Sequence, residues 1–135
     1  CAKENKRECM SDSTVGIIIL NYNGAEDTLN CIRSVEQFNT SPVKFIVVDN
    51  CSTKAGQVDF LHEQLETMYG DKYRKEEERS AYTSSVLPYV TFVTSKTNDG
   101  YARGNNKGIR LAQSDETITH LMILNSDVLF VQDII

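Results

Sequence analysis

Four short apolar runs recur along the chain, and each has the length of a β-strand. They read VGIIIL (15–20), VKFIVV (43–48), YVTFVT (89–94) and THLMIL (119–124). Three of them are dominated by β-branched residues, and their apolar positions follow one another instead of alternating with polar ones. This continuity is typical of strands that are covered on both faces, as in a parallel sheet.

Helical spacing separates these runs. After the first run, Asn23 and Glu26 stand where an N-cap and its capping-box partner belong. The apolar stripe of this helix is Leu29, Ile32, Val35 and Phe38. A second helix is predicted over about 57–69, and a third over about 101–113. The residues expected to point inward from the second helix are Phe60, Leu61, Leu65 and Met68.

The order β-α-β-α-β-α-β predicts an open, doubly wound and mostly parallel α/β sheet with right-handed crossovers, ending after its fourth strand. Residues 1–13 are polar and are expected to form a flexible arm before a domain over 14–135. Within that domain, about 70–88 is expected to be an inserted, solvated loop without chemistry of its own. Its basic and acidic side chains nearly balance.

Composition narrows the classes of partner. The chain has 135 residues, is 40% hydrophobic and carries a net charge of −5, which suits one globular domain and disfavours nucleic acid or anionic membrane as partners. A phosphate-bearing ligand would therefore need a metal or local positive charge. No apolar run approaches the roughly 20 residues of a membrane span. We expect a cytoplasmic protein whose four cysteines, Cys1, Cys9, Cys31 and Cys51, are reduced thiols.

A polar cluster follows every apolar run. The clusters are NYNG (21–24), DNCS (49–52), SKTNDG (95–100) and NSD (125–127). In an open parallel sheet, ligands bind outside the carboxyl ends of the strands, so the four clusters are expected to line one crevice. The alternative is that Asn, Asp, Ser and Gly follow strands because they favour turns.

The stretch NDGYARGNNKGIRLA places Gly104 and Gly108 on one face of the third helix. Each costs about 0.8–1 kcal/mol relative to alanine inside a helix, so tight packing or the approach of a ligand must compensate. Gly100, just before the helix, would leave room for a ligand near free backbone N–H groups.

Other nucleotide and nucleophile chemistries are disfavoured. The first strand is followed by Gly24 alone and lacks GxGxxG, and GxxxxGK[ST] is absent from the chain. His62 and His120 are predicted within a helix and at the start of a strand, away from the crevice. Both are expected to be structural.

Four segments together resemble a known family. VGIIILNYNGAEDTLNCIRSV, FIVVDNCST, TNDGYARGNNKGI and LMILNSDVLF, in this order, closely resemble the N-terminal half of family 2 glycosyltransferases. The resemblance covers roughly residues 14–133 apart from the expected insertion. It implies a Rossmann-like GT-A fold that binds a nucleotide-diphosphate sugar at the ends of the strands.

The resemblance also implies roles for particular residues. Tyr22 would pack on or near the nucleobase, and Asp49 would accept a hydrogen bond from it. Asn98 and Gly100 would border the nucleotide.

The family's DxD-like element reads Asn125-Ser126-Asp127 in this chain, so its first acid is missing. Asn125 is expected beside the nucleotide. Asp127 would hold Mg²⁺ or Mn²⁺ on the diphosphate, because such an ion often takes only one or two protein carboxylates together with substrate phosphates.

The implied function is that of the donor-binding part of an inverting glycosyltransferase. It would move a sugar to an acceptor hydroxyl on a sugar or lipid-linked acceptor, in cell-surface polysaccharide or glycoconjugate synthesis. The full-length enzyme could act at the inner face of the membrane. The catalytic base is expected beyond Ile135, so residues 1–135 alone are expected to be inactive and to self-associate. The alternative is a nucleotide-binding or interaction module that never catalyses transfer, and a nicotinamide-binding domain ranks third.

Overall fold

The strands of this protein pair in the order β3-β4-β2-β1-β5, and every neighbouring pair is parallel. The structure, a computed structural model, describes residues 13–79, 81–98 and 100–126. Its elements are β1 (Val15–Asn21), α2 (Ala25–Phe38), β2 (Val43–Asp49), α3 (Gln57–Tyr69), the 3₁₀ helix η1 (Gly70–Lys72), β3 (Tyr73–Glu77), β4 (Val90–Thr94), α4 (Gly100–Gln113) and β5 (His120–Asn125).

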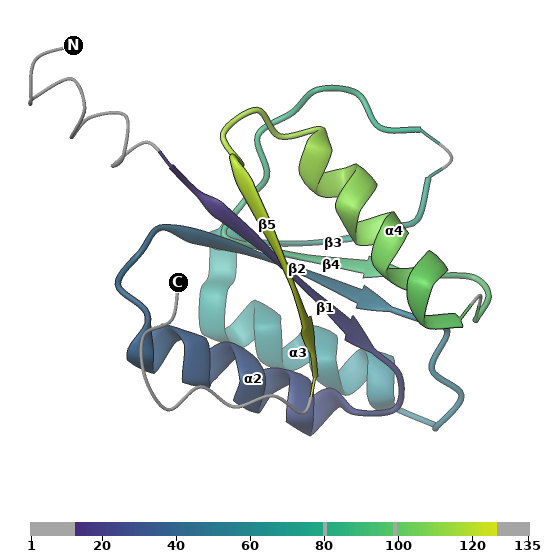
Figure 1. Cartoon of the computed structure of the whole chain (residues 1–135). Coiled ribbons are helices and arrows are strands. Elements are labelled where there is room, and N and C mark those ends of the chain that lie inside the picture. Colours follow the sequence, from purple (N-terminus) through teal and green to yellow (C-terminus); the bar gives the residue numbers. More distant parts are fainter. Residues whose placement is uncertain (1–12, 80, 99, 127–135) are drawn as a thin grey trace, which may run out of the picture.

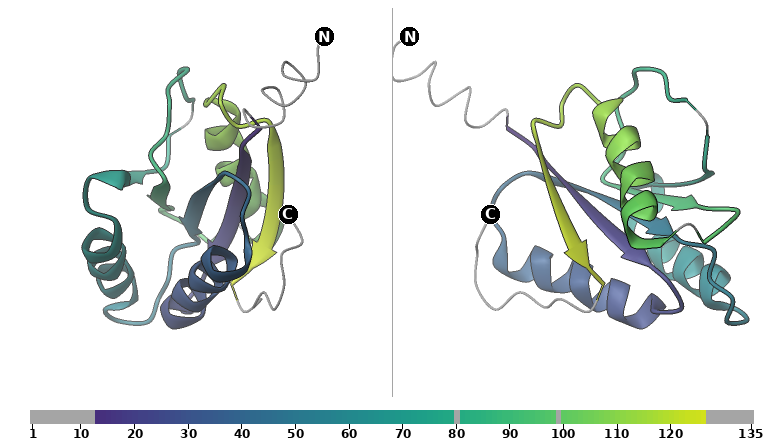
Figure 2. Two further views of the ribbon diagram at one scale, coloured as in Figure 1. Left: turned by 90° about the vertical axis from the view of Figure 1, so that its left-hand side faces the viewer. Right: turned by 45° about the vertical axis from the view of Figure 1, so that its right-hand side comes forward.

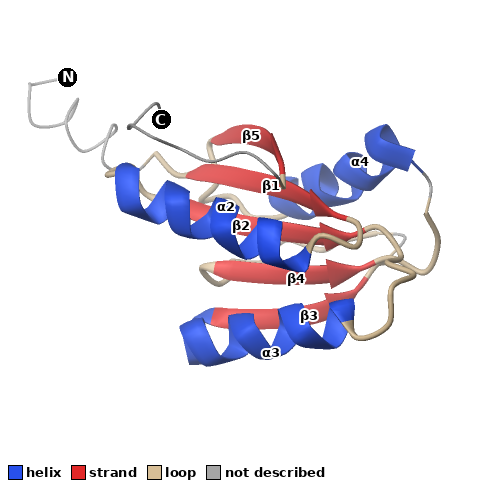
Figure 3. Ribbon diagram, turned by 90° about the horizontal axis from the view of Figure 1, so that it is seen from below, coloured by secondary structure: helices blue, strands red, loops and turns tan. Residues whose placement is uncertain are grey.

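Helices cover both faces of the sheet. Helices α2 and α3 lie on one face and α4 lies on the other (Figures 1 and 3). The sheet therefore separates two apolar clusters. Ile17, Phe45 and Phe92 belong to the cluster on the α2–α3 face, whereas Ile18 and Val48 belong to the cluster on the α4 face. In β1, β2 and β4, consecutive residues thus point to opposite sides that are both buried, which explains the unbroken apolar runs of these three strands.

The predicted open, doubly wound α/β sheet is confirmed, and the four apolar runs are strands. The helix predicted over 57–69 is α3, and the one predicted over 101–113 is α4. Of the residues expected to face inward from α3, Leu61 and Leu65 are fully buried. The expectation for Phe60 is wrong, because 37% of its surface is exposed.

The segment between α3 and β4 contains a strand that the hydrophobic pattern did not predict. Strand β3 reads YRKEE and pairs with β4 at the edge of the sheet. Tyr73 contacts His62 of α3 through its hydroxyl, at 2.8 Å from Nδ1. An edge strand needs apolar side chains on only part of its surface, and charged side chains on it oppose pairing with other chains. A strand of this composition carries no apolar run by which it could be recognised.

No helix in the described part of the chain is both long and apolar enough to cross a membrane. Cys31 and Cys51 are free thiols, and Cys31 is buried. Cys1 and Cys9 lie outside the described residues.

Candidate functional site

The parallel arrangement brings the polar clusters to one edge of the sheet. Asn21 at the end of β1 pairs in register with Asp49 at the end of β2, and Asp49 pairs with Thr94 of β4. On the other side of β1, Leu20 pairs with Asn125 of β5. Figure 3 shows the arrowheads of β1, β2 and β4 ending along this edge. The described parts of all four clusters thus lie at the same end of the sheet, where the crevice is expected.

Asp49 is the centre of a buried hydrogen-bond network. Its side chain is almost inaccessible, since only 2% of the residue is exposed. One carboxylate oxygen accepts from Asn21 Nδ2 at 3.0 Å and from Ser52 Oγ at 2.5 Å, and the other accepts from Ser52 N at 3.0 Å. Asn21 Oδ1 in turn accepts from Thr28 Oγ1 at 2.8 Å. The carboxylate predicted to meet a base therefore also holds two loops and helix α2 together.

Asn23 joins the loop after β1 to the loop after β2 by hydrogen bonds. Its backbone N–H donates to Ser52 Oγ at 2.9 Å, and its Nδ2 donates to Thr53 Oγ1 at 3.1 Å. Its Oδ1 accepts from the backbone N–H of Lys54 at 2.8 Å. The residue has a positive φ of 53°, which asparagine tolerates better than most residues. The two loops consequently form one preorganised wall.

The capping box predicted at the start of α2 is wrong. The helix begins at Ala25 with Gly24 as its N-cap, and no side chain caps it from that position. Asn23 is engaged with the neighbouring loop and cannot reach back with Glu26 as a capping pair. Instead, Gln57 Oε1 accepts from the Ala25 N–H at 3.0 Å, so a residue of α3 satisfies this free donor.

Tyr22 projects from the wall with much of its ring accessible. The residue is 45% exposed, and its hydroxyl lies 3.3 Å from Thr53 Oγ1. This contact orients the ring while leaving its surface available. An accessible aromatic ring at this edge of the sheet can stack on a planar ligand such as a nucleobase.

Asn50 joins the loop after β2 to the start of α4. Its Nδ2 donates to Asn98 Oδ1 at 3.0 Å and lies 3.4 Å from the Gly100 carbonyl oxygen. Asn98 Oδ1 also accepts from the Gly100 N–H at 3.0 Å. Cys51 Sγ adds a contact of 3.4 Å to the Lys96 carbonyl oxygen. Asn98 and Gly100, both predicted site residues, are thus positioned by a residue to which the sequence assigned no role.

The three glycines around α4 have two different explanations. Gly100 has a φ of +85° with open space around it, so its backbone conformation favours glycine. A Cβ on Gly104 would lie 2.6 Å from Leu20 Cδ1, and one on Gly108 would lie 2.7 Å from Ile18 Cγ2. Tight packing of α4 on the sheet therefore accounts for Gly104 and Gly108.

Two buried amide oxygens near α4 lack partners in the described part of the chain. Asn50 Oδ1 and Asn105 Oδ1 accept no hydrogen bond, although each residue is only 3% exposed. Leaving such a group unsatisfied costs about 1–3 kcal/mol. A ligand donor at Asn50 would recover this cost and would leave the bonds of its Nδ2 intact.

The predicted metal element is only partly described. Asn125 ends β5, and its carbonyl oxygen lies 3.9 Å from Cys31 Sγ. Ser126 Oγ lies 3.7 Å from the position of a Cβ on Gly24, which puts this element beside the loop after β1. Asp127 lies outside the described residues. Within those residues, no group of three or more His, Cys, Asp or Glu side chains could hold a metal ion.

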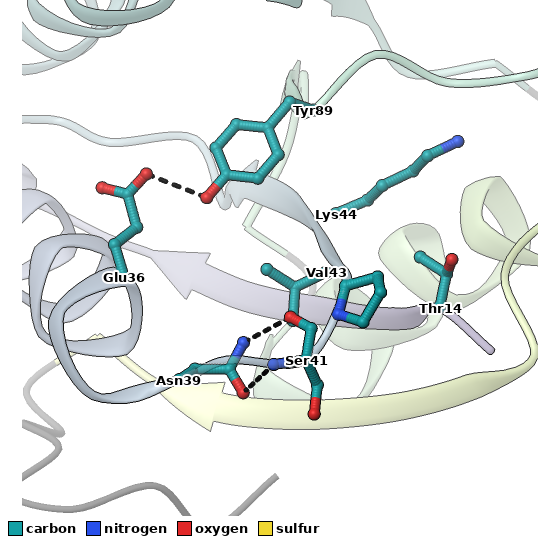
Figure 4. A pocket seen from close by; sticks show the side chains of 8 residues that line it. Thr14, Glu36, Asn39, Ser41, Val43, Lys44 and Tyr89 are labelled. Atoms are coloured by element: carbon teal, nitrogen blue, oxygen red, sulfur yellow. Dashed lines mark hydrogen bonds between the residues drawn. The ribbon is translucent and has the colours of Figure 1, made fainter. Parts of the chain in front are cut away.

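A different hollow, of about 500 Å³, lies at the opposite end of the strands, near Val43 at the start of β2 (Figure 4). Glu36 accepts from the Tyr89 hydroxyl at 2.8 Å and from the Tyr69 hydroxyl at 2.9 Å. Burial, followed by the hydrogen bond to Glu36, raises the pKa of Tyr89 well above its usual value, so this hydroxyl stays a donor. Lys44 is paired with Asp115 at 2.7 Å. The charged side chains here serve the fold.

The two histidines lie away from the crevice, as predicted. His62 lies within α3 and contacts Tyr73, and His120 begins β5, where its Nδ1 lies 2.9 Å from Thr119 Oγ1.

Sequence reasoning missed Asn21, Asn50 and Ser52 as individual site-building residues. All three stand in the polar clusters NYNG and DNCS, so their position after a strand was a usable signal. Their partners could not be read from the sequence, because each bond depends on which strands are neighbours in the sheet.

An open parallel sheet with helices on both faces and a polar edge at the ends of its strands defines the Rossmann-like class of ligand-binding domains, to which the GT-A fold belongs. The sequence profile of glycosyl transferase family 2 matches residues 16–134, so the chain belongs to this family. No curated protein matches the chain as a relative. The family establishes the glycosyltransferase class and, in general, a nucleotide-sugar donor and an acceptor as substrates.

Proposed function

We propose that the carboxyl edge of the sheet binds the nucleoside-diphosphate part of a sugar donor. The observation that carries this proposal is the preorganised wall formed by the loops after β1 and β2, from which the accessible ring of Tyr22 projects. The ring would stack on the nucleobase, with Asp49 close by. Asn98, Gly100 and Asn125 would border the rest of the nucleotide.

The chain would serve as the donor-binding part of an inverting glycosyltransferase. In such a transfer, the acceptor hydroxyl oxygen bonds to the anomeric carbon as the bond from that carbon to the diphosphate oxygen breaks. A base removes the hydroxyl proton from the face opposite the leaving group, and we expect this base beyond Ile135. The residues of this chain would bind and orient the donor. The product of the transfer would belong to polysaccharide or glycoconjugate synthesis at the cytoplasmic side of the membrane.

Enzymes of this family generally depend on a divalent ion. Mg²⁺ or Mn²⁺ would act as a Lewis acid on the departing diphosphate. The Asp49 carboxylate already accepts three hydrogen bonds and offers little capacity to a metal. The described residues therefore do not form a metal site by themselves, and Asp127, together with phosphate oxygens of the donor, remains the predicted ligand.

Replacing Tyr22 by alanine tests the base-stacking role. Base–aromatic stacking contributes about 1–3 kcal/mol, so Tyr22→Ala should weaken nucleoside-diphosphate binding by about fivefold or more. We expect the unaltered chain to bind with a Kd on the order of 0.1–1 mM in Mn²⁺. Isothermal titration calorimetry with a panel of nucleoside diphosphates, in Mn²⁺ and in EDTA, measures the Kd of the unaltered chain and the loss of affinity in Tyr22→Ala.

Phe60→Ala is the matched control, because Phe60 is also an exposed aromatic residue but lies on α3. It should bind as the unaltered chain does. Equal affinities of Tyr22→Ala and Phe60→Ala for every nucleotide would contradict the proposed base site.

A further inference from the structure

A second hollow, of about 350 Å³, lies on the α4 face of the sheet, outside the crevice described above. The chain that leaves β3 runs back beside α4 before it enters β4 (Figures 1 and 2), and Ser85 N donates to Ser114 O at 2.9 Å. The hollow lies between this segment and the helix. Its lining residues are Glu78, Arg79, Tyr82, Lys96, Lys107 and Arg110.

An ion pair between a buried lysine and a partly buried glutamate forms one side of this hollow. Lys107 is only 8% exposed, and its Nζ lies 3.0 Å from Glu78 Oε2 and 3.1 Å from Ser95 Oγ. Glu78 Oε1 accepts from the backbone N–H of Lys96 at 2.8 Å. The single carboxylate of the hollow is therefore already committed to its buried ammonium group and to the loop after β4. It cannot also neutralise the remaining cations.

Three exposed basic side chains surround this pair. The side chains of Arg79, Lys96 and Arg110 make no hydrogen bond or ion pair within the described ranges 13–79, 81–98 and 100–126. Four basic residues against one acidic residue leave a local charge of +3, in a chain whose net charge is −5. A concave surface lined by charges of one sign concentrates its field and attracts a counter-ion. A ligand that carries one carboxylate group would neutralise only one of the three charges.

We propose that this hollow binds a phosphate-bearing anion. Arg79 and Arg110 present planar guanidinium groups suited to phosphate oxygens, and Lys96 adds a third positive charge. The Tyr82 hydroxyl accepts from Arg79 N at 3.2 Å and can still donate its own proton to the anion. Lys96 precedes Asn98 in the same loop, so occupancy of the hollow would also order a border of the candidate nucleotide crevice. The anion site itself stands independently of the proposed donor site.

The test is titration of the 135-residue chain with inorganic pyrophosphate in EDTA at low salt, followed by calorimetry and by amide shifts in NMR spectra. The double substitution Arg79→Gln and Arg110→Gln should weaken binding at least about fivefold, since both guanidinium groups lose their charge-assisted bonds. It leaves the Glu78–Lys107 pair in place. Arg33→Gln, on the opposite face of the sheet, is the charge-matched control and should bind within about twofold of the unaltered chain.

The outcomes separate the sites and the sources of phosphate. Equal pyrophosphate binding by the double variant and the control, or no binding by the unaltered chain, overturns the proposal. Amide shifts that gather in the loops after β1 and β2 instead of around the hollow would place the anion in the nucleotide crevice and overturn the proposal as well. Retention on phosphatidic acid vesicles but not phosphatidylcholine vesicles, with the same dependence on Arg79 and Arg110, identifies a lipid headgroup. Binding of soluble pyrophosphate alone identifies a free phosphorylated ligand.

Discussion

Asp49 shows how one side chain can serve the fold and the site together. As a sequence feature it is a carboxylate at the tip of a strand, which suggests ligand binding. In the structure it accepts three hydrogen bonds from Asn21 and Ser52. Its replacement by alanine would therefore disturb the loops that carry Tyr22, and a loss of nucleotide affinity alone could not be assigned to the base contact.

Asp49→Asn tests the structural role because it keeps the shape of the side chain while removing its negative charge. An amide in this position must turn its NH₂ group toward at least one of the donors on Asn21 or Ser52. We expect the free energy of unfolding in urea to fall by about 1–3 kcal/mol, with nucleotide affinity reduced in parallel. Asp71→Asn, an exposed acid in η1, should change the stability by less than about 0.5 kcal/mol. Unchanged stability in Asp49→Asn would refute the structural role.

At the scale of elements, one ion pair joins β2 to the turn between α4 and β5. Lys44 Nζ lies 2.7 Å from Asp115 Oδ2, and the same carboxylate accepts from Leu87 N at 2.8 Å and Thr117 N at 2.8 Å. Burial alone would raise the pKa of Asp115. The hydrogen bonds from Lys44, Thr117 and Leu87 outweigh it and lower the pKa to about 2. The carboxylate thus stays ionised well into acid.

This lowered pKa predicts how stability depends on pH. The folded state binds the Asp115 proton less readily than the unfolded chain, whose aspartate titrates near about 3.9. The stabilisation is therefore present above about pH 4 and is lost as the pH falls toward 2. Urea unfolding of Asp115→Asn should show lower stability at pH 7, and a shallower decline between pH 4 and 2, than the unaltered chain. Parallel pH profiles of the two proteins would contradict this assignment.

For the whole molecule, the exposed surface of β5 is the feature with the clearest consequence. This strand ends the sheet on the side of β1, and Leu121 and Ile123 are 41% and 43% exposed. Met122 and Leu124 pack against the core on the other face. An edge strand that also presents apolar side chains is open to pairing with another chain.

We therefore expect the 135-residue chain to self-associate through β5. Ile123→Lys should shift the sedimentation velocity distribution toward monomer, because a charge on this face opposes edge pairing. Val86→Lys is the control, since Val86 is 68% exposed but lies in the segment between β3 and β4. An oligomer that persists in Ile123→Lys, or that disappears equally in Val86→Lys, would exclude β5 as the contact.

The sequence by itself determined the elements in which apolar residues recur with the spacing of a strand or a helix. The apolar runs marked β1, β2 and β4 because these strands bury both faces. The run of β5 is apolar although one of its faces is exposed, and the helical stripes marked α2 and α3. The sequence also has polar residues after each of these strands. Because the strands are parallel, these residues lie together at the carboxyl ends of the strands. The family resemblance rested on the same four segments, and the match over residues 16–134 confirms it.

Only the tertiary structure decided which of these groups meet. Strand β3 is charged and lies at an edge, so its identity depends on pairing with β4 and not on any apolar period. Asn23 bonds the loop after β2 instead of capping α2, because that loop lies within reach and Gln57 satisfies the helix instead. The hollow beside α4 likewise gathers Arg79, Lys96 and Arg110 from three separate segments. Local patterns report burial and backbone preference, whereas contacts between distant residues follow from the order of strands.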